Sequence, residues 1–254
     1  MGQRLENAKR LYLEAIRDGD YENAIHRYAG GRYTQHSTPV KDGKDGFIEF
    51  FADFVKRNPV RDIEVVRAFE DGQYVFLHVL QNLNNGEWRY VTADIFDTDD
   101  DSKLIEHWDI IAEMQAKTAS GRTELDGPTE PKDLDQTQAN KQLVRRFIDE
   151  VLVPRDLDRL SEFLAADVAQ HNPGIADGLE AFREHAAGSG LRCVKARNVI
   201  GCGDFVAALA EYEIGGKPSA VIDLFRVDNG RIVEHWDVIE TITPRETWVN
   251  SGKF

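Results

Sequence analysis

The chain has 254 residues, of which 41% are hydrophobic and 30% charged, and its formal net charge is −14 at pH 7. This composition predicts a soluble globular protein of one large or two ordinary domains, and the negative charge argues against nucleic acid as a partner. No apolar run approaches the roughly 18 residues of a membrane span, and the first residues lack the apolar core of a secretory signal. The two cysteines have no metal-ligand spacing, so we expect reduced thiols and a cytoplasmic protein.

The first half begins with helical patterns and continues with strands. Apolar side chains at helical spacing predict an amphipathic helix within residues 5–16 and a shorter helix within 20–29. A short strand carrying Gln35 and His36 follows. The remaining segments alternate as expected of β-strands. The predicted strands are 61–69, 74–82, 87–96 and 104–112.

A third helix is predicted between the Gln-His strand and the later strands. Asp42 is expected to be its N-cap, with Asp45 at the capping-box position. In the second half, Asp177 and Glu180 stand at the corresponding places. The turn pairs predict hairpins, because both central residues of such turns need positive φ. These pairs are Asn85-Gly86, Gly215-Gly216 and Asn229-Gly230.

The whole pattern occurs twice. EHWDII at 106–111 returns as EHWDVI at 234–239, and YTQHSTP at 33–39 matches VAQHNPG at 168–174. A period this long indicates a duplicated domain rather than a solenoid. The intervening stretch is rich in Gly, Pro, Thr and Asp and predicts an exposed linker. SGRTEL at 120–125 and NSGKF at the C-terminus look like related tails.

These features predict an α+β protein of two domains with a short linker. The expected boundaries are residues 1–122, 123–135 and 136–254. In each domain, helices come first and a curved antiparallel meander follows, which is an α+β arrangement.

QH(S/N)-P, the following DG-x-x-x-F and the D-x-F…EHWD pair resemble the SnoaL-like polyketide cyclases, within the cone-shaped superfamily of nuclear transport factor 2 and ketosteroid isomerase. The resemblance covers roughly residues 4–122 and 136–254. It implies two tandem cone-shaped α+β barrel domains, each with three helices on a curved sheet and a pocket of its own. Because relatives pair through their sheets, it also implies an intramolecular pseudo-dimer, which could associate further.

Side chains alternate between the two faces of a strand, so His107 and Asp109 share one face of the EHWD strand and Glu106 and Trp108 the other. The resemblance implies that Asp109, and Asp237 in the second copy, are the general acid/base of an aldol-type ring closure. An apolar pocket would raise the pKa of such a carboxyl toward neutrality. The alternative is a structural carboxylate bonded to a backbone amide or a neighbouring His.

The other predicted site residues come from the same comparison of copies. His36 and His171 are expected in the pockets as catalytic groups that bind or polarise a substrate oxygen, unless they are core histidines bonded to backbone. The predicted substrate-binding groups are Asp94, Asp223, His107, His235, Tyr12 and His78. We expect the histidines of EHWD to support an Asp by hydrogen bonding and the tryptophans to serve in packing. His78 belongs to the first copy alone, because Leu209 replaces it in the second.

Other chemistries of the superfamily are disfavoured by what the sequence lacks. The Arg-x-Asp pair of its epoxide hydrolases is missing from 75–81 and 206–214, and both copies place His where ketosteroid isomerases are expected to carry their base. No close-spaced ligand set or phosphate loop is visible, so we expect neither metal nor cofactor.

The leading hypothesis is a cofactor-independent cyclase or isomerase acting on a small hydrophobic carbonyl compound. The rival is a non-enzymatic ligand-binding or stress-response protein of the same fold, because fold does not fix function.

Overall fold

The computed structural model describes residues 2–254 and divides them into two compact units. The first consists of residues 2–113 together with 243–254, and the second of residues 114–242. The C-terminal tail therefore belongs to the first unit, and the segment that follows the first repeat belongs to the second.

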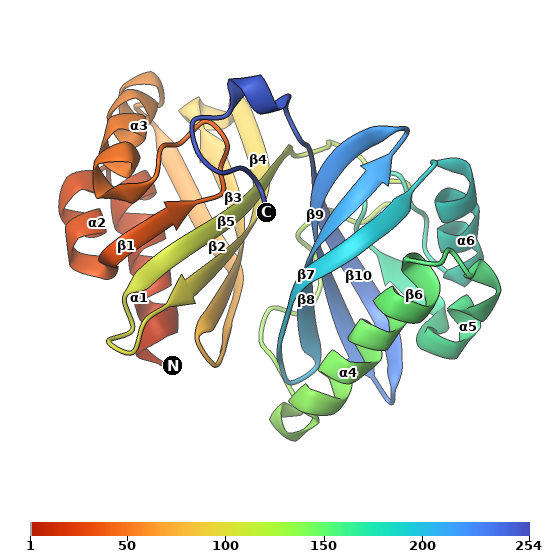
Figure 1. Cartoon of the computed structure of the whole chain (residues 1–254). Helices are drawn as coiled ribbons and strands as arrows, with labels where there is room; N and C mark the ends of the chain where they lie inside the picture. The colour runs from red at the N-terminus through yellow and green to blue at the C-terminus, as the bar shows by residue number, and fades with distance from the viewer. Residues whose placement is uncertain (1) are drawn as a thin grey trace. The chain divides into compact units, whose positions relative to one another are not determined.

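The first unit consists of helices followed by strands, as predicted (Figure 1). Its elements are α1 (Gln3–Tyr12), the π-helical η1 (Leu13–Arg17), α2 (Tyr21–Tyr28), β1 (Ala29–Gln35), α3 (Gly43–Arg57), β2 (Arg61–Asp71), β3 (Tyr74–Leu83), η2 (Asn84–Gly86), β4 (Trp88–Thr98), β5 (Leu104–Glu113) and, in the C-terminal tail, η6 (Arg245–Thr247). The strands form one sheet in the order β1-β5-β4-β3-β2, in which β1 is parallel to β5 and the other neighbours are antiparallel.

The second unit repeats this architecture. Its elements are η3 (Leu134–Gln136), α4 (Thr137–Phe147), the π-helical η4 (Ile148–Leu152), η5 (Leu157–Arg159), α5 (Leu160–Phe163), β6 (Leu164–Gln170), α6 (Leu179–Gly188), β7 (Arg192–Cys202), β8 (Phe205–Ile214), β9 (Lys217–Asp228) and β10 (Arg231–Thr241). The sheet order β6-β10-β9-β8-β7 matches that of the first unit, again with one parallel pair. These are the two tandem α+β cone domains that the repeat predicts.

Each unit has its own hydrophobic core between its helices and its sheet. In the first unit, α1 supplies Leu11 and the odd-numbered β3 residues Leu77 and Val79 pack toward the helices. The hairpin turns form where predicted, with positive φ at both residues of each Asn-Gly or Gly-Gly pair. No helix within residues 2–254 is long and apolar enough to cross a membrane.

The predicted capping role of Asp42 and Asp177 is wrong. Asp42 precedes α3 but its side chain makes no capping bond, and α6 begins one residue later than predicted, after Gly178. Both carboxylates instead accept a hydrogen bond from a strand backbone, from Gln35 N at 2.8 Å and from Gln170 N at 2.9 Å. They therefore fasten the strand that carries the Gln-His pair in each unit.

Candidate functional site

A cavity of about 90 Å³ lies inside the first unit between the sheet and the helices. Most of its wall is apolar. The aromatic lining residues are Tyr12, Tyr33, Phe47, Phe50, Phe51, Phe54 and Phe96. The polar lining residues are Gln35, Ser37, Gln81, Asp94, His107 and Asp109. A hollow of this size holds several water molecules or a small organic molecule.

Strand pairing brings the polar lining residues together. In the antiparallel ladder Asp94 lies directly opposite Asp109, and the parallel pairing sets Gln35 beside His107. Glu106 and Trp108 contact His36 instead and are absent from the cavity wall. The predicted division of the EHWD strand between two faces is thus confirmed.

His107 links Gln35 to Asp94. Its Nδ1 lies 3.0 Å from Gln35 Oε1 and its Nε2 lies 2.9 Å from Asp94 Oδ1. Burial raises the pKa of Asp94, although the bond and charge of His107 oppose this, and the nearby charge of Asp109 adds to the rise. The histidine therefore supports Asp94 rather than Asp109.

A second chain of hydrogen bonds reaches the other oxygen of Asp94. Gln81 Nε2 donates to Tyr12 Oη at 2.6 Å, Tyr12 and Thr92 hydroxyls lie 2.9 Å apart, and Thr92 Oγ1 donates to Asp94 Oδ2 at 2.7 Å. Because Gln81 fills an acceptor position, the Tyr12 proton is directed at Thr92. Tyr12 lines the cavity as expected, with its hydroxyl already bonded to protein groups.

Asp109 forms an ion pair with the C-terminal tail. Its Oδ1 lies 3.1 Å from Lys253 Nζ, which also donates to the Asp109 backbone oxygen at 2.8 Å. Burial alone would raise the pKa of this carboxyl. The Lys253 ammonium, the His107 charge and hydrogen bonds from Lys253 and Ser37 outweigh burial and hold the pKa below its usual value. The expected rise toward neutrality does not occur at Asp109.

His36 lies outside the cavity, contrary to its predicted place. Its Nε2 bonds Glu106 Oε1 at 2.8 Å, its Nδ1 donates to Gly252 O at 2.6 Å, and its ring stacks on Trp108 at 4.7 Å between centroids. The prediction failed because Gln35 takes the inward position on β1, so its neighbour must point the other way.

His171 repeats this arrangement in the second unit. It bonds Glu234 Oε1 at 2.9 Å and the Thr123 carbonyl at 2.7 Å and stacks on Trp236. Both ring nitrogens of each histidine are engaged away from the inward-facing groups, so the structure gives the pair a supporting role.

His78 also lies away from the cavity. It is buried on β3 with its Nδ1 3.2 Å from Arg67 Nη1, while its neighbours Leu77 and Val79 face the helices. The predicted substrate contact of His78 is therefore not made by this fold.

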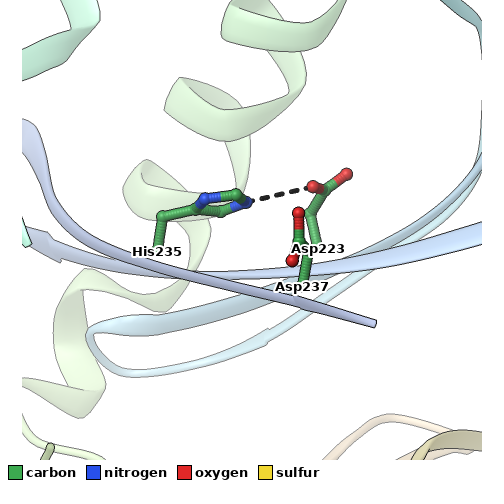
Figure 2. A group of neighbouring side chains, drawn as sticks. All are labelled: Asp223, His235 and Asp237. Carbon is green, nitrogen blue, oxygen red and sulfur yellow. Dashed lines mark hydrogen bonds and ion pairs between the residues drawn. The ribbon is translucent and has the colours of Figure 1, made fainter. Parts of the chain in front are cut away.

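The second unit brings Asp223, His235 and Asp237 together (Figure 2). His235 Nε2 lies 3.1 Å from Asp223 Oδ1 and its Nδ1 lies 2.9 Å from Gln170 Oε1. The ring pKa is raised, because the bond to Asp223 and the charges of Asp237 and Asp223 outweigh burial, which would lower it. This is the Gln-His-Asp arrangement of the first unit.

Asp237 differs from Asp109 in its charge environment. Asn172 Nδ2 donates to both of its oxygens, at 2.9 and 2.6 Å. Burial and the neighbouring charge of Asp223 raise the pKa of Asp237 to about 6, against opposition from His235 and Asn172. The rise that was predicted for the pKa of the EHWD aspartate therefore occurs in this unit.

A tyrosine reaches the inner Asp in both units by different routes. In the first unit Tyr12 comes from α1 and acts through Thr92, and in the second Tyr212 comes from β8 and donates directly to Asp223 Oδ2 at 3.0 Å. Phe147 fills the α4 position that corresponds to Tyr12. Comparing the two copies could not identify Tyr212, because Tyr212 aligns with Gln81 rather than with another tyrosine.

Asp223, His235 and Asp237 each offer one ligand atom, and these atoms lie within 4.8 Å of one another. The same oxygens already accept bonds from Tyr212, His235 and Asn172. Binding a cation there would require these bonds to rearrange. That the protein uses no metal stays a prediction.

The two related tails occupy corresponding places in the opposite units. Gly252 O receives the His36 bond and Lys253 follows it, whereas Thr123 O receives the His171 bond and Glu124 follows it. Glu124 is buried, so part of the predicted linker is interior. Burial raises the pKa of Glu124, and the charge of Asp237 adds to this. One tail thus brings a cation to its aspartate and the other brings a carboxyl.

Three solved structures with a similar fold each cover less than half of this chain. A Kribbella flavida protein provisionally assigned as a ketosteroid isomerase is 16% identical, with 43% of this chain and 84% of that chain covered and a TM-score of 0.38. IdmH from Streptomyces antibioticus, provisionally assigned as a polyketide cyclase, is 20% identical over 40% and 91%, with a TM-score of 0.34. An LEH-like epoxide hydrolase of M. tuberculosis is 23% identical over 41% and 85%, with a TM-score of 0.35.

No protein of curated function matches the chain. The model of the SnoaL-like domain matches residues 9–107 and again residues 144–235. These two segments include Asp94 and Asp223, and they end within β5 and β10, two residues before Asp109 and Asp237. With most of its length matched in two successive copies, the chain belongs to the SnoaL-like domain family as a tandem two-domain member.

Proposed function

We propose that the first unit catalyses proton transfer at a carbon next to a carbonyl group, in a small, largely apolar compound, as in an aldol-type cyclase or an isomerase. The observation that carries this proposal is a buried carboxylate, Asp109, in the wall of a cavity whose other walls are mostly aromatic. Such a cavity binds an apolar body and leaves one charged group to act on it.

Asp109 is assigned as the general base. Its lowered pKa keeps it ionised at neutral pH, so the form that accepts a proton is always present. By lowering the pKa, Lys253 keeps Asp109 ionised but also reduces the proton affinity of its carboxylate. The gain must therefore come from position, since holding a base against its proton contributes a large part of enzymatic rate enhancement.

Asp94 and His107 are assigned as the substrate-binding pair that handles the returning proton. They share a hydrogen bond at 2.9 Å beside Asp109, and the raised pKa of Asp94 favours its protonated form relative to Asp109. Two neighbouring carboxyls with separated pKa values suit one group to the base role and the other to the acid role.

Asp237 is proposed as the acid/base group of the second unit, with Asp223 and His235 beside it. Its pKa of about 6 lies close to the range in which a group both gives and takes protons efficiently. We propose no catalytic role for His36 and His171, because their ring nitrogens are bonded to Glu side chains and tail carbonyls. Pairing of the halves through their sheets and a cytoplasmic location remain predictions.

The test is exchange of α-hydrogen for deuterium in a simple ketone, cyclohexanone, followed by NMR in D₂O. We expect exchange above the buffer rate, and a loss of about 10²-fold or more on Asp109→Asn, the usual contribution of a general base. Asp97→Asn is the matched control, since Asp97 is a buried aspartate of β4 outside the cavity wall. Undiminished exchange in the double variant Asp109→Asn/Asp237→Asn would remove the acid/base assignment.

The rival function is storage or sensing of a small hydrophobic molecule without turnover. The Asp109–Lys253 ion pair favours it, because a carboxylate already engaged by a cation is less available to a substrate. Under this function cyclohexanone would bind the wild type and Asp109→Asn alike, with no exchange in either.

A further inference from the structure

The Tyr33 hydroxyl is buried without a hydrogen-bond partner among the described residues. Tyr33 lies on β1, is 3% exposed and lines the cavity of the first unit. Its ring meets Phe47 edge-on at 6.0 Å and lies parallel to the His107 ring at 6.5 Å. The phenol is thus held by packing, and its polar end has no assigned contact.

An unpaired buried hydroxyl destabilises a fold, so its retention needs a reason. Other buried tyrosine hydroxyls here are bonded: Tyr12 to Thr92, Tyr28 to Glu14 and Tyr212 to Asp223. The second unit has Val168 at the position of Tyr33, buried in the same strand of the same fold. The architecture therefore does not require a phenol at this position.

The surroundings fix the kind of partner that the hydroxyl can take. Burial, with the charges of Asp109 and Asp94, raises the pKa of Tyr33 well above its usual value, so the phenol stays protonated and donates. The same two carboxylates disfavour an anionic ligand in the cavity. An uncharged acceptor on an apolar body fits these conditions, and the volume of about 90 Å³ keeps that body small.

We propose that Tyr33 is the donor that binds the carbonyl oxygen of a small neutral ketone or aldehyde in the cavity of the first unit. This inference rests on the proposed function and names its missing component. As Asp109 removes the α-proton, the electron pair of the C–H bond forms the carbon–carbon double bond and the carbonyl π-pair moves to oxygen. The resulting enolate oxygen accepts the Tyr33 hydrogen bond, which is strongest at that point.

The enolate then needs no co-reactant from outside the substrate. In an isomerisation, the proton taken up by Asp109 returns through the Asp94–His107 pair to a carbon of the enolate system. In an aldol closure, the enolate carbon attacks a second carbonyl carbon of the same molecule, and the proton passes to the new alkoxide. Tyr33 remains protonated throughout and serves as the oxyanion donor.

The decisive variant is Tyr33→Phe, tested with two probes of the same shape. Cyclohexanone has a carbonyl oxygen, and methylenecyclohexane replaces it with a carbon that cannot accept a hydrogen bond. We expect Tyr33→Phe to weaken cyclohexanone binding by about 5- to 10-fold, the usual worth of one hydrogen bond, and to leave methylenecyclohexane binding unchanged. The ¹³C resonance of the bound carbonyl should also move upfield.

A stability measurement separates this role from a structural one. Because the hydroxyl is unpaired, Tyr33→Phe should have a melting temperature equal to or above that of the wild type. Tyr28→Phe is the matched control: its hydroxyl bonds Glu14 at 2.7 Å away from the cavity, so it should lower the melting temperature and leave cyclohexanone binding intact.

Equal cyclohexanone affinity in Tyr33→Phe and wild type would overturn the inference, as would a wild type with no preference between the probes. Failure of the proposed function looks different. If the wild type prefers the ketone through Tyr33 but exchanges no deuterium, the donor stands and Asp109 is not the base. If exchange proceeds at the same rate in Tyr33→Phe, Asp109 stands and the donor assignment falls.

Discussion

Asp109 and Asp237 stand at matching places in the two EHWD motifs, the first buried and the second half-buried, yet their pKa values shift in opposite directions. Burial raises both values. What differs is the nearest polar group, the Lys253 ammonium in one unit and the Asn172 amide in the other. An ammonium favours the carboxylate far more than a neutral amide does, so one chain holds the same side chain in two charge states near pH 5.

Lys253→Met should raise the pKa of Asp109. The substitution keeps the apolar stem and removes the charge, so burial is no longer outweighed by the ammonium. Since the base must be ionised, the acidic limb of the exchange-rate profile should move to higher pH. The pKa is measured by ¹³C NMR of the Asp109 carboxyl, with Lys103→Met, whose ammonium bonds the Arg27 carbonyl, as the control. If the acidic limb of the pH–rate profile does not move in Lys253→Met, Lys253 does not set the charge of Asp109.

At the scale of elements, the strands and turns were predictable because their signals are local. Alternation fixed β2 to β5 to within a few residues, and Asn-Gly and Gly-Gly pairs fixed the turns. The side-chain faces of β5 followed from the same alternation. Within the candidate site this was enough to place His107 and Asp109 in the cavity wall.

The errors arose where partners are distant in sequence. His36 was placed wrongly because the inward face of β1 depends on its pairing with β5, about 70 residues away. Lys253 could not be found because its partner Asp109 is 144 residues distant and the tail has no periodic pattern. Tyr33 gave no signal because a missing hydrogen bond becomes visible only in the folded chain.

Removal of the last six residues should destabilise the first unit selectively. The tail supplies the ammonium for Asp109, the Gly252 carbonyl for His36 and the Asn250 amide for two loop carbonyls. Leaving the buried Asp109 carboxylate without its cation, and one ring nitrogen of the buried His36 without its acceptor, costs several kcal/mol together. Hydrogen exchange should show lost protection in β5 and β1. Equal loss in β10 would contradict the assignment of the tail to the first unit.

At the scale of the whole molecule, the two units should respond differently to pH. Asp237 has a pKa of about 6 in the folded protein against an ordinary value of 3.8, so folding of the second unit favours the protonated form. Its contribution is present below pH 4 and is lost as the pH rises to about 6, by about 3 kcal/mol at most. At Asp109 the sign reverses, because a lowered pKa adds stability above the unfolded pKa and loses it in acid.

We predict that the free energy of unfolding of β10, measured by amide hydrogen exchange, falls between pH 4.5 and 7. The substitution Asp237→Asn should reduce this fall. His235, whose pKa is raised, also loses stabilising protonation as the pH rises, so part of the fall should remain. Asp204→Asn serves as the control, since Asp204 is a buried aspartate of the same unit bonded to Lys132 N. An identical pH response in Asp237→Asn and wild type would contradict the raised pKa.

The tail that follows each repeat belongs to the unit built from the other repeat, and this has a consequence for the evolution of the gene. After a gene duplicates and fuses, each repeat normally diverges under selection on its own product. Here a codon change at Lys253 or Glu124 alters the charge environment of an aspartate that the other repeat encodes. The two repeats therefore do not evolve independently. A deep mutational scan should therefore find its strongest epistasis between positions more than a hundred codons apart. Recombination that exchanges one repeat intact would transfer an aspartate without the tail residue that sets its charge environment.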